Sequence, residues 1–338
     1  MKKSLLFLLC CAALNFTSCS DDDDTTPNTD DKTTAKEFLE EKKNSTKQEF
    51  EVNVSELPKT FTFKEGVKIT IPEGALLKDG QPITGKFTLE VREMLKPSSI
   101  VFSSTNTNLT DGSYLETDGF IYVNVKQNGN YIDAQLAKNI AISIPTDKED
   151  GTMTQLWTGT EEAGENENQF AWQGLNDNDI IWQNDNDSIG QNQDGNMVWA
   201  KNSNFEFSFG KLGWCNCDLP WGQGKEFTTV TVELTGNVGK FASYFALDGD
   251  TFVLFCGKGY PVLAQLYTKV NETTVKSYDN SMPIGVQGKM IAFSIQNGKF
   301  SFASKDITIE KDMKLTLDLK EVTKAELTKQ IEALDGYK

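Results

Sequence analysis

The sequence predicts a mainly β fold of two antiparallel β-sandwich domains, joined by a tryptophan-rich insert and followed by a short C-terminal helix. Apolar and polar residues alternate over much of residues 50–146 and again over 225–322, a pattern typical of strands buried on one face. The pairs Asn128-Gly129 and Asn297-Gly298 separate such runs, and Asn-Gly is a strong hairpin signal. Because no long stretch has helical periodicity, antiparallel sandwiches are favoured over α/β folds.

The first two dozen residues predict a membrane-anchored lipoprotein. Lys2 and Lys3 precede an apolar run over residues 5–14, which is short for a membrane span and typical of a secretory signal. A small residue followed by Cys19 resembles a bacterial lipobox, which implies cleavage after residue 18 and lipid on Cys19. The acidic run Asp21–Asp24 resembles the surface-export signal of Bacteroidetes lipoproteins. We therefore expect an outer-membrane lipoprotein that faces the cell surface; an ordinary secreted protein is the alternative.

Charge and composition exclude several classes of function. The chain has 33 basic and 49 acidic residues, and loss of both N-terminal lysines with the signal changes its formal net charge from −16 to −18. Binding of nucleic acid relies on cationic neutralisation of phosphates, so none is expected. The chain contains no histidine, which excludes Ser-His-Asp and Cys-His nucleophile systems and His-ligated metals. A pair of carboxylates, as in glycosidases, is not excluded.

Residues 19–49 are expected to form an acidic tether that ends in a short helix. Residues 20–34 are almost wholly polar, which is typical of a disordered linker. A helix is predicted over Thr34–Lys43, because Thr34 and Glu37 have the spacing of a capping box.

The first β-domain is predicted over residues 50–146. Its segment Val67–Leu76 resembles the opening of ZU5-type β-sandwich domains, and Gly85–Glu93 is similar to the version found in uncharacterised Bacteroidetes surface lipoproteins. The chain from Met282 to Leu334 also resembles those lipoproteins. ZU5 domains are interaction scaffolds, so the resemblance implies binding and supplies no catalytic residues.

The insert over residues 147–224 holds every tryptophan of the chain and is expected to form hairpins with long polar loops. Trp182 and Trp199 flank a loop rich in Asn and Asp, and they are the candidates for stacking on sugar rings. The alternative is that the tryptophans fill a core that is poor in aliphatic residues. Asp185–Asn196 begins like a calcium loop but departs from the EF-hand pattern, and no metal is expected. The six tryptophans are Trp157, Trp172, Trp182, Trp199, Trp214 and Trp221.

The second β-domain is predicted over residues 225–322, as a transthyretin-like or immunoglobulin-like sandwich. A helix over residues 323–336 follows, with Thr323 and Glu326 at capping-box spacing. Leu327, Ile331 and Leu334 line one helix face, which we expect to pack on the second sandwich.

Cys10 and Cys11 would leave with the signal, and three cysteines then remain besides Cys19. Cys256 has a candidate disulfide partner in Cys217, with Cys215 as another choice, since an oxidising compartment permits one disulfide and one spare thiol. Buried free thiols are the alternative.

We therefore expect a monomeric cell-surface lipoprotein that acts as a non-enzymatic interaction or envelope-structural module, without a cofactor. Its partners would be the membrane, through the lipid, and an envelope protein or polysaccharide. A glycan-binding protein that uses exposed tryptophans is the alternative. A more distant alternative is a carboxylate glycosidase, which requires two acidic groups facing each other across a cleft.

Overall fold

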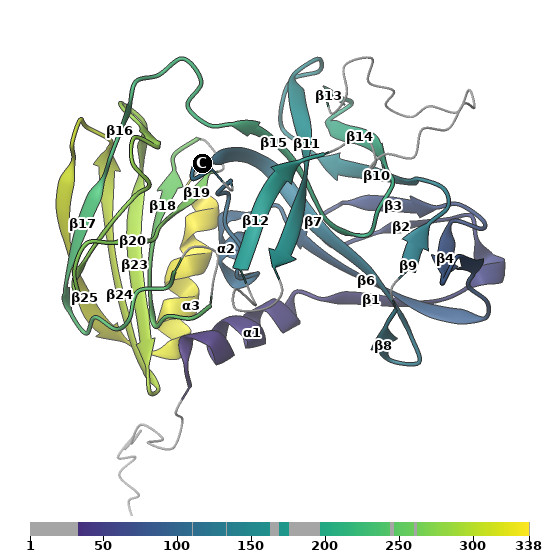
Figure 1. Ribbon diagram of the computed structural model, residues 1–338, viewed down its shortest axis with the longest axis horizontal. Helices are drawn as coiled ribbons and strands as arrows, with labels where there is room; N and C mark the ends of the chain where they lie inside the picture. Colours follow the sequence, from purple (N-terminus) through teal and green to yellow (C-terminus); the bar gives the residue numbers. More distant parts are fainter. Residues whose placement is uncertain are drawn as a thin grey trace, which may run out of the picture. The chain divides into compact units, whose positions relative to one another are not determined.

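The computed structural model describes residues 33–109, 111–132, 134–162, 169–175, 197–243, 247–259 and 262–337. Residues from Lys32 onward belong to one compact unit. This unit is mainly β and contains two large curled sheets, of twelve and eight strands, and a short C-terminal helix (Figure 1). No described helix is long and apolar enough to cross a membrane.

The twelve-stranded sheet is wholly antiparallel, and β1 and β2, the two ends of its strand order, are separated in sequence by only five residues. Residues 147–224, expected as hairpins, supply central strands of this sheet: β15 and β11 lie between β7 and β13. The strand order is β1 (Gln48–Asn53), β6 (Lys86–Met94), β7 (Leu115–Gln127), β15 (Gly213–Pro220), β11 (Met153–Glu162), β13 (Met197–Lys201), β14 (Asn204–Phe209), β10 (Ile140–Pro145), β3 (Lys68–Ile71) and β2 (Lys59–Thr62), with β12 (Gln169–Gly174) on β11 and β8 (Asn130–Tyr131) on β7.

The eight-stranded sheet is also curled, and β19 and β20 at the two ends of its order are separated in sequence only by Tyr267. Its β17 and β25 are parallel, and its other neighbouring strands are antiparallel. The strand order is β19 (Leu263–Leu266), β18 (Thr251–Gly257), β23 (Gln287–Gln296), β24 (Lys299–Thr308), β25 (Lys314–Val322), β17 (Thr231–Gly236), β21 (Thr274–Lys276) and β20 (Thr268–Lys269).

Two small sheets and several short helices complete the described chain. The small sheets are β5-β4-β9, formed by Gln81–Pro82, Leu76–Lys78 and Ala134–Leu136, and β16-β22, formed by Phe227–Thr228 and Met282–Pro283. The helices are α1 (Ala35–Ser45), α2 (Pro97–Phe102), α3 (Lys324–Glu332) and the 3-10 turns η1 (Val54–Glu56) and η3 (Ala333–Gly336).

Both predicted capping boxes are present. The amide of Glu37 donates to Thr34 Oγ1 (3.2 Å) and the Thr34 amide donates to Glu37 Oε2 (2.8 Å). Thr323 and Glu326 make the equivalent pair at 3.1 and 2.8 Å. Each pair satisfies two amides that the helix itself leaves open, so both helices begin at the residues that the sequence predicts.

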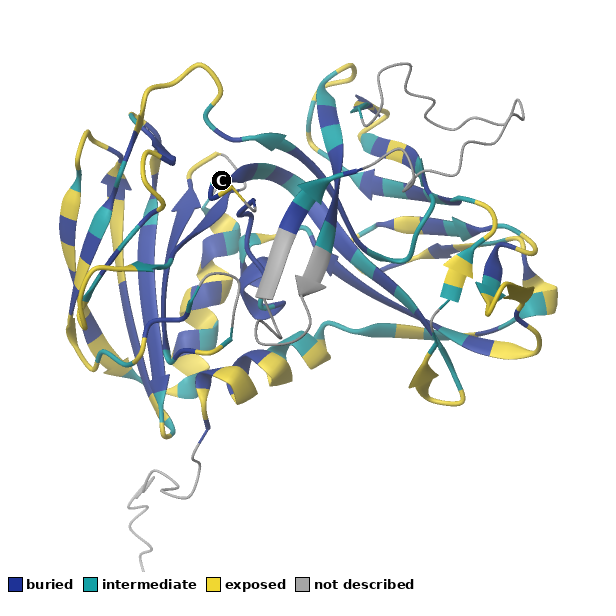
Figure 2. Ribbon diagram, viewed as in Figure 1, coloured by how far each residue is buried: buried dark blue, intermediate teal, exposed yellow. Residues whose placement is uncertain are grey.

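Buried apolar side chains form three clusters, two inside the sheets and one between them. Buried residues are found along the strands of both large sheets (Figure 2). The cluster between the sheets contains α1 and α3, whose Leu327, Ile331 and Leu334 are buried as expected. It also contains side chains of α2, such as Ile100, and Phe120 of β7. The C-terminal helix therefore packs on the eight-stranded sheet and, at the same time, belongs to the core that joins the two sheets.

Candidate ligand-binding cleft

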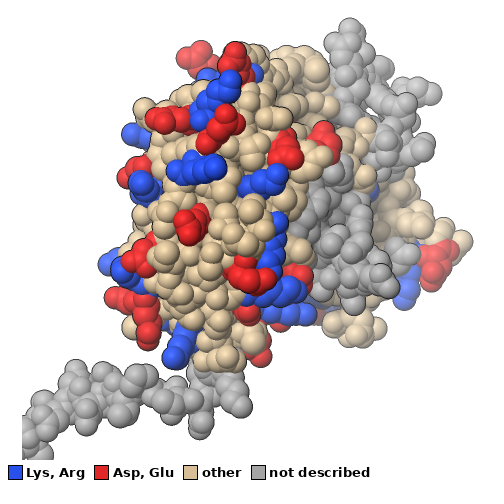
Figure 3. Space-filling view, turned by 60° about the vertical axis from the view of Figure 1, so that its left-hand side comes forward, with Lys and Arg blue, Asp and Glu red and all other residues tan. Residues whose placement is uncertain are grey.

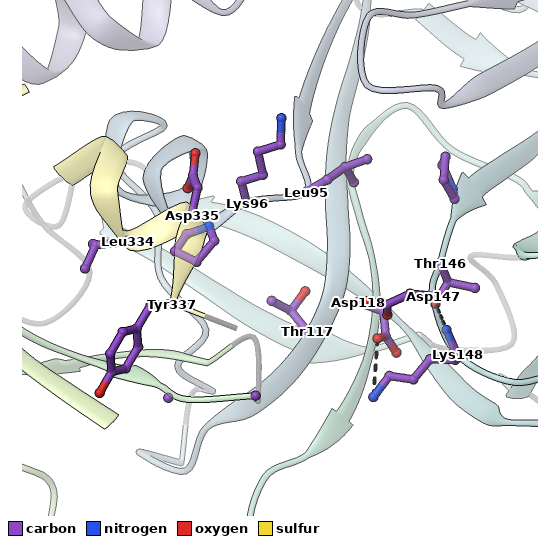
Figure 4. Close-up of a pocket in the computed structure, with 14 residues that line it drawn as sticks. Leu95, Lys96, Thr117, Asp118, Thr146, Asp147, Lys148, Leu334, Asp335 and Tyr337 are labelled. Atoms are coloured by element: carbon purple, nitrogen blue, oxygen red, sulfur yellow. Dashed lines mark hydrogen bonds and ion pairs between the residues drawn. The ribbon is translucent and has the colours of Figure 1, made fainter. Parts of the chain in front are cut away.

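A cleft of about 580 Å³ lies where the two sheets and the C-terminal helix meet (Figure 4). Its size falls in the range of small-molecule sites. The twelve-stranded sheet contributes β7 and the end of β10, and the other side is formed by the end of β18 and by η3. The lining residues are Leu95, Lys96, Pro97, Thr117, Asp118, Pro145, Thr146, Asp147, Lys148, Gly257, Gly259, Leu334, Asp335 and Tyr337.

A β-bulge in β7 forms one wall of this cleft. Thr117 pairs with Asp218 of β15, and Phe120 pairs with Asn216, so two residues of β7 oppose one of β15. The extra residue reverses which face the side chains occupy: Leu115 before the bulge is in the core between the sheets, whereas Ile121 after it is inside the twelve-stranded sheet. The bulge thereby lets one strand serve two cores.

Gly119 makes this bulge possible. Its φ is +115°, a conformation that disfavours every residue with a Cβ atom. A Cβ atom at Gly119 would also lie 2.5 Å from Leu95 Cδ2. The Gly119 amide donates to Thr117 Oγ1 at 3.0 Å, which holds the turn of the bulge. The neighbouring Asp118 then lines the cleft.

Asp118 is the most perturbed acid among the residues that line the cleft. Its side chain is only 11% exposed, and burial raises its pKa to about 6, with Glu116 and Asp147 adding to the effect. Lys148 opposes the shift: its Nζ lies 3.7 Å from Asp118 Oδ1 and 3.5 Å from Glu116 Oε1. Burial would lower the Lys148 pKa, but the two carboxylates outweigh it and the pKa is raised. A carboxyl with a raised pKa in a cleft is a feature of functional sites.

A second carboxyl lies behind this wall, on β15. Asp218 is fully buried, and burial raises its pKa well above its ordinary value, which favours the neutral acid. Asn216 Nδ2 donates to Asp218 Oδ2, and Thr117 Oγ1 donates to Asn216 Oδ1 at 3.0 Å. Asp218 Oδ1 has no hydrogen-bond partner among the described residues. Buried polar groups link Thr117 of the cleft wall to Asp218.

The opposite side of the cleft is built from groups that hold the fold together. Both carboxylate oxygens of Asp335 accept hydrogen bonds from Ser98, one from its amide (2.8 Å) and one from its Oγ (2.7 Å), so Asp335 caps α2. Lys96 Nζ pairs with Glu65 Oε2 at 2.5 Å. The acid opposite Asp118 is thus engaged as a helix cap.

Tyr337 completes the cleft beside η3. Its ring lies 4.9 Å from Lys289 Nζ, and its hydroxyl is hydrogen-bonded to Asp306. Burial and this carboxylate raise the pKa of Tyr337 to about 12. The ring therefore stays neutral and presents an aromatic surface to the cleft.

The candidate glycan residues lie elsewhere. Trp199 is on β13, directly opposite Met153 of β11, and is 44% exposed. Trp182, the Asp185–Asn196 loop and Cys19 lie outside the described residues. The other described tryptophans are buried and belong to cores: Trp157, Trp172, Trp214 and Trp221. The structure therefore exposes one of the two candidates and does not gather it into the cleft.

The cysteines named as a candidate disulfide are free thiols in the structure. Cys217 is buried inside the twelve-stranded sheet, and Cys256 is buried in the cluster between the sheets. Burial raises the pKa of both thiols. The described residues contain no cluster of three or more Cys, Asp or Glu suited to a metal ion.

The cleft is not predicted from the sequence, although one local signal is present. Asp118 and Gly119 directly precede the apolar run Phe120–Val123, and an isolated glycine within a strand is a sign of a bulge. The other walls come from segments that are distant in the sequence. No family model, no curated protein and no solved structure matches this chain.

Proposed function

We propose that this chain is a cell-surface lipoprotein that binds an envelope ligand in the cleft between its two sheets, without catalysing a reaction. The observation that carries the proposal is the cleft itself: about 580 Å³, lined by apolar residues such as Leu95 and Leu334 and by the desolvated carboxyl of Asp118. An apolar pocket that holds a few polar groups with shifted pKa values is the usual form of a ligand site.

The charged residues of the cleft support binding rather than catalysis. Asp118 pairs with Lys148, Lys96 pairs with Glu65, and Asp335 caps α2. Groups held by such partners can orient a ligand through their remaining hydrogen-bonding capacity. We also propose that residues 50–146 form a ZU5-like domain and that residues 225–322 form a second sandwich. Cys19 would carry the lipid.

The position of the cleft fits an anchor at the N-terminal end. Thr33, where the described chain begins, accepts a hydrogen bond from the amide of Gly298, at the turn between β23 and β24. Lys324 at the start of α3 pairs with Glu41 of α1, whereas Leu334 beyond the far end of α3 lines the cleft. The described start of the chain and the cleft therefore lie toward opposite ends of α3.

The test is to obstruct the cleft without disturbing the core. Asp147 is an exposed residue that lines the cleft, and Asp150 is an exposed residue of the same loop that does not. Soluble protein from residue 32 would be immobilised and exposed separately to the purified envelope polysaccharide and to the solubilised envelope proteins of the source cells. We expect Asp147→Trp to abolish binding and Asp150→Trp to retain it. Equal binding by both variants and the parent would contradict the proposal.

Glycan binding on the face of β13 is the second candidate, because Trp199 is 44% exposed there. A flat aromatic ring on a sheet surface can stack on a sugar. In the same assay, Trp199→Ala would abolish binding of the polysaccharide while Asp147→Trp would not. Loss of binding in Asp147→Trp alone would reject this candidate.

A further inference from the structure

The eight-stranded sheet has a seam between β24 and β25. These antiparallel strands pair only over Phe300–Phe302 and Lys320–Val322. Beyond that point β24 stays paired with β23 as far as Thr308, and β25 stays paired with β17 back to Lys314. A groove of about 420 Å³ lies along the separated strands, lined on one side by Phe302–Lys305, on the other by Thr316–Asp318 and Lys320, and also by Gln330 of α3.

The register places one lysine at the point of separation. Lys305 lies opposite Met290 of β23 without a register shift, and Met290 is fully buried in the core inside the sheet. Its neighbours on the same face, Ala303 and Ile307, belong to that core as well. Continuing the β24–β25 register would bring Lys305 opposite the buried Leu317. Lys305 therefore occupies an interior register position, yet it is exposed.

This lysine explains why the ladder stops. An ammonium group buried without a partner is strongly destabilising, and Lys305 has no ion pair with a described residue. Separation of the strands gives the ammonium group access to water. Core residues next to the groove stay nearly covered, with Ala303 9% and Leu317 3% exposed.

The strand register also shows which backbone groups face the seam. The carbonyl of Met313 accepts from the Thr231 amide, so the odd-numbered residues that follow it on β25 direct their backbone groups to β17. Backbone direction alternates along a strand, so Thr316 and Asp318 face the seam. On β24 every second residue after Phe302 also directs its backbone groups to the seam. These residues are Ser304 and Asp306.

We propose that this seam binds one extended peptide strand, in which a carboxylate side chain lies opposite Lys305. Open strand edges accept an added strand through backbone hydrogen bonds. The surrounding surface mixes charges of both signs (Figure 3), so the selection is local and comes from Lys305. The occupant has small apolar side chains next to the carboxylate on its inner face, because Ala303 and Leu317 line the groove.

The test uses the heptapeptide Thr-Val-Thr-Glu-Thr-Val-Thr with blocked termini, and the same peptide with Gln at its centre. Fluorescence anisotropy on soluble protein from residue 32 is expected to show a threefold to fivefold preference, about what an accessible ion pair gives, for the Glu peptide. Lys305→Met, in which β24 and β25 can pair further, is expected to bind both peptides more weakly and without preference, whereas Lys299→Met, on the same strand but outside the groove, retains the preference. No binding at millimolar protein, or equal binding of both peptides by the parent, overturns the proposal.

Backbone pairing is tested separately, on the peptide rather than on the protein. Two further peptides carry N-methyl groups either on the Thr residues or on the Val and Glu residues, which blocks the amides of one strand edge at a time. We expect at least one of them to bind tenfold or more weakly than the parent peptide. If both bind as tightly as the parent, the peptide does not pair with a strand edge and the proposal fails.

Discussion

The two curled sheets accommodate a charged residue within a strand in opposite ways. In β7 an extra residue at Asp118 and Gly119 shifts the register, and Asp118 lines a cleft while the ladder to β15 resumes on both sides. In β24 the register to β23 is unbroken at Lys305, and the neighbouring strand β25 moves away instead. A bulge keeps the sheet closed and creates a pocket, whereas an unshifted register opens the sheet and exposes strand edges.

The bulge is where a substitution is expected to have the largest effect. Gly119→Ala places a Cβ atom 2.5 Å from Leu95 Cδ2 and forces alanine to adopt a φ of +115°. We expect a loss of about 3 kcal/mol in the free energy of unfolding, measured by urea denaturation. Gly129→Ala is the control: its φ is also positive, at +79°, but nothing lies within 4 Å of the added atom. If Gly119→Ala lowered the free energy of unfolding no more than Gly129→Ala does, the bulge would not be tightly packed.

The charge at the bulge gives the next effect, which depends on pH. Burial raises the pKa of Asp118 from its ordinary 3.8 to about 6, so the folded state binds its proton more tightly than the unfolded state does. Its contribution to stability therefore falls as pH rises from about 4 to about 6 and is constant above that range. Asp118→Asn should stabilise the fold by about 3 kcal/mol at pH 7.5 and by much less at pH 4. A gain that is independent of pH would contradict this assignment.

The seam should respond to removal of its charge. Lys305→Met places an apolar side chain at a position whose cross-strand partner, Met290, is already buried. We expect the free energy of unfolding to rise by about 1 kcal/mol, together with slower hydrogen exchange at the amides of Thr316 and Asp318, because β24 and β25 can then pair further. Lys299→Met, before the groove, should leave both quantities unchanged. Unchanged exchange in Lys305→Met would show that the lysine does not hold the seam open.

Local patterns in the sequence predicted the elements better than their assembly. The alternation of apolar residues and the two capping boxes are local signals, and strands and helices form where they occur. The pairing of β7 with β15 joins segments about a hundred residues apart, and no local signal specifies it. The tryptophans illustrate the consequence: Trp172 looked like part of a polar insert, but it is buried between the sheets with its Nε1 donating to the Asn106 carbonyl at 2.8 Å.

The candidate sites differ in the same way. The cleft could not be assembled from the sequence, because Asp118, Lys148 and Asp335 come together only through the packing of both sheets. The seam has a more local signal, since Lys305 lies at period two between Ala303 and Ile307, where a strand buried on one face would carry an apolar residue. The residues most informative about sites are those that break an alternating pattern, namely a glycine in β7 and a charged residue in β24.

The most direct test of the cleft is an NMR titration of the Asp118 side-chain carboxyl in soluble protein from residue 32, with the signal assigned by its loss in Asp118→Asn. The account predicts a pKa of about 6, because the carboxyl lines a cleft where burial outweighs the attraction of Lys148. A pKa at or below 4 would mean that water reaches Asp118 freely or that Lys148 dominates. The desolvated wall on which the proposed ligand site depends would then not exist.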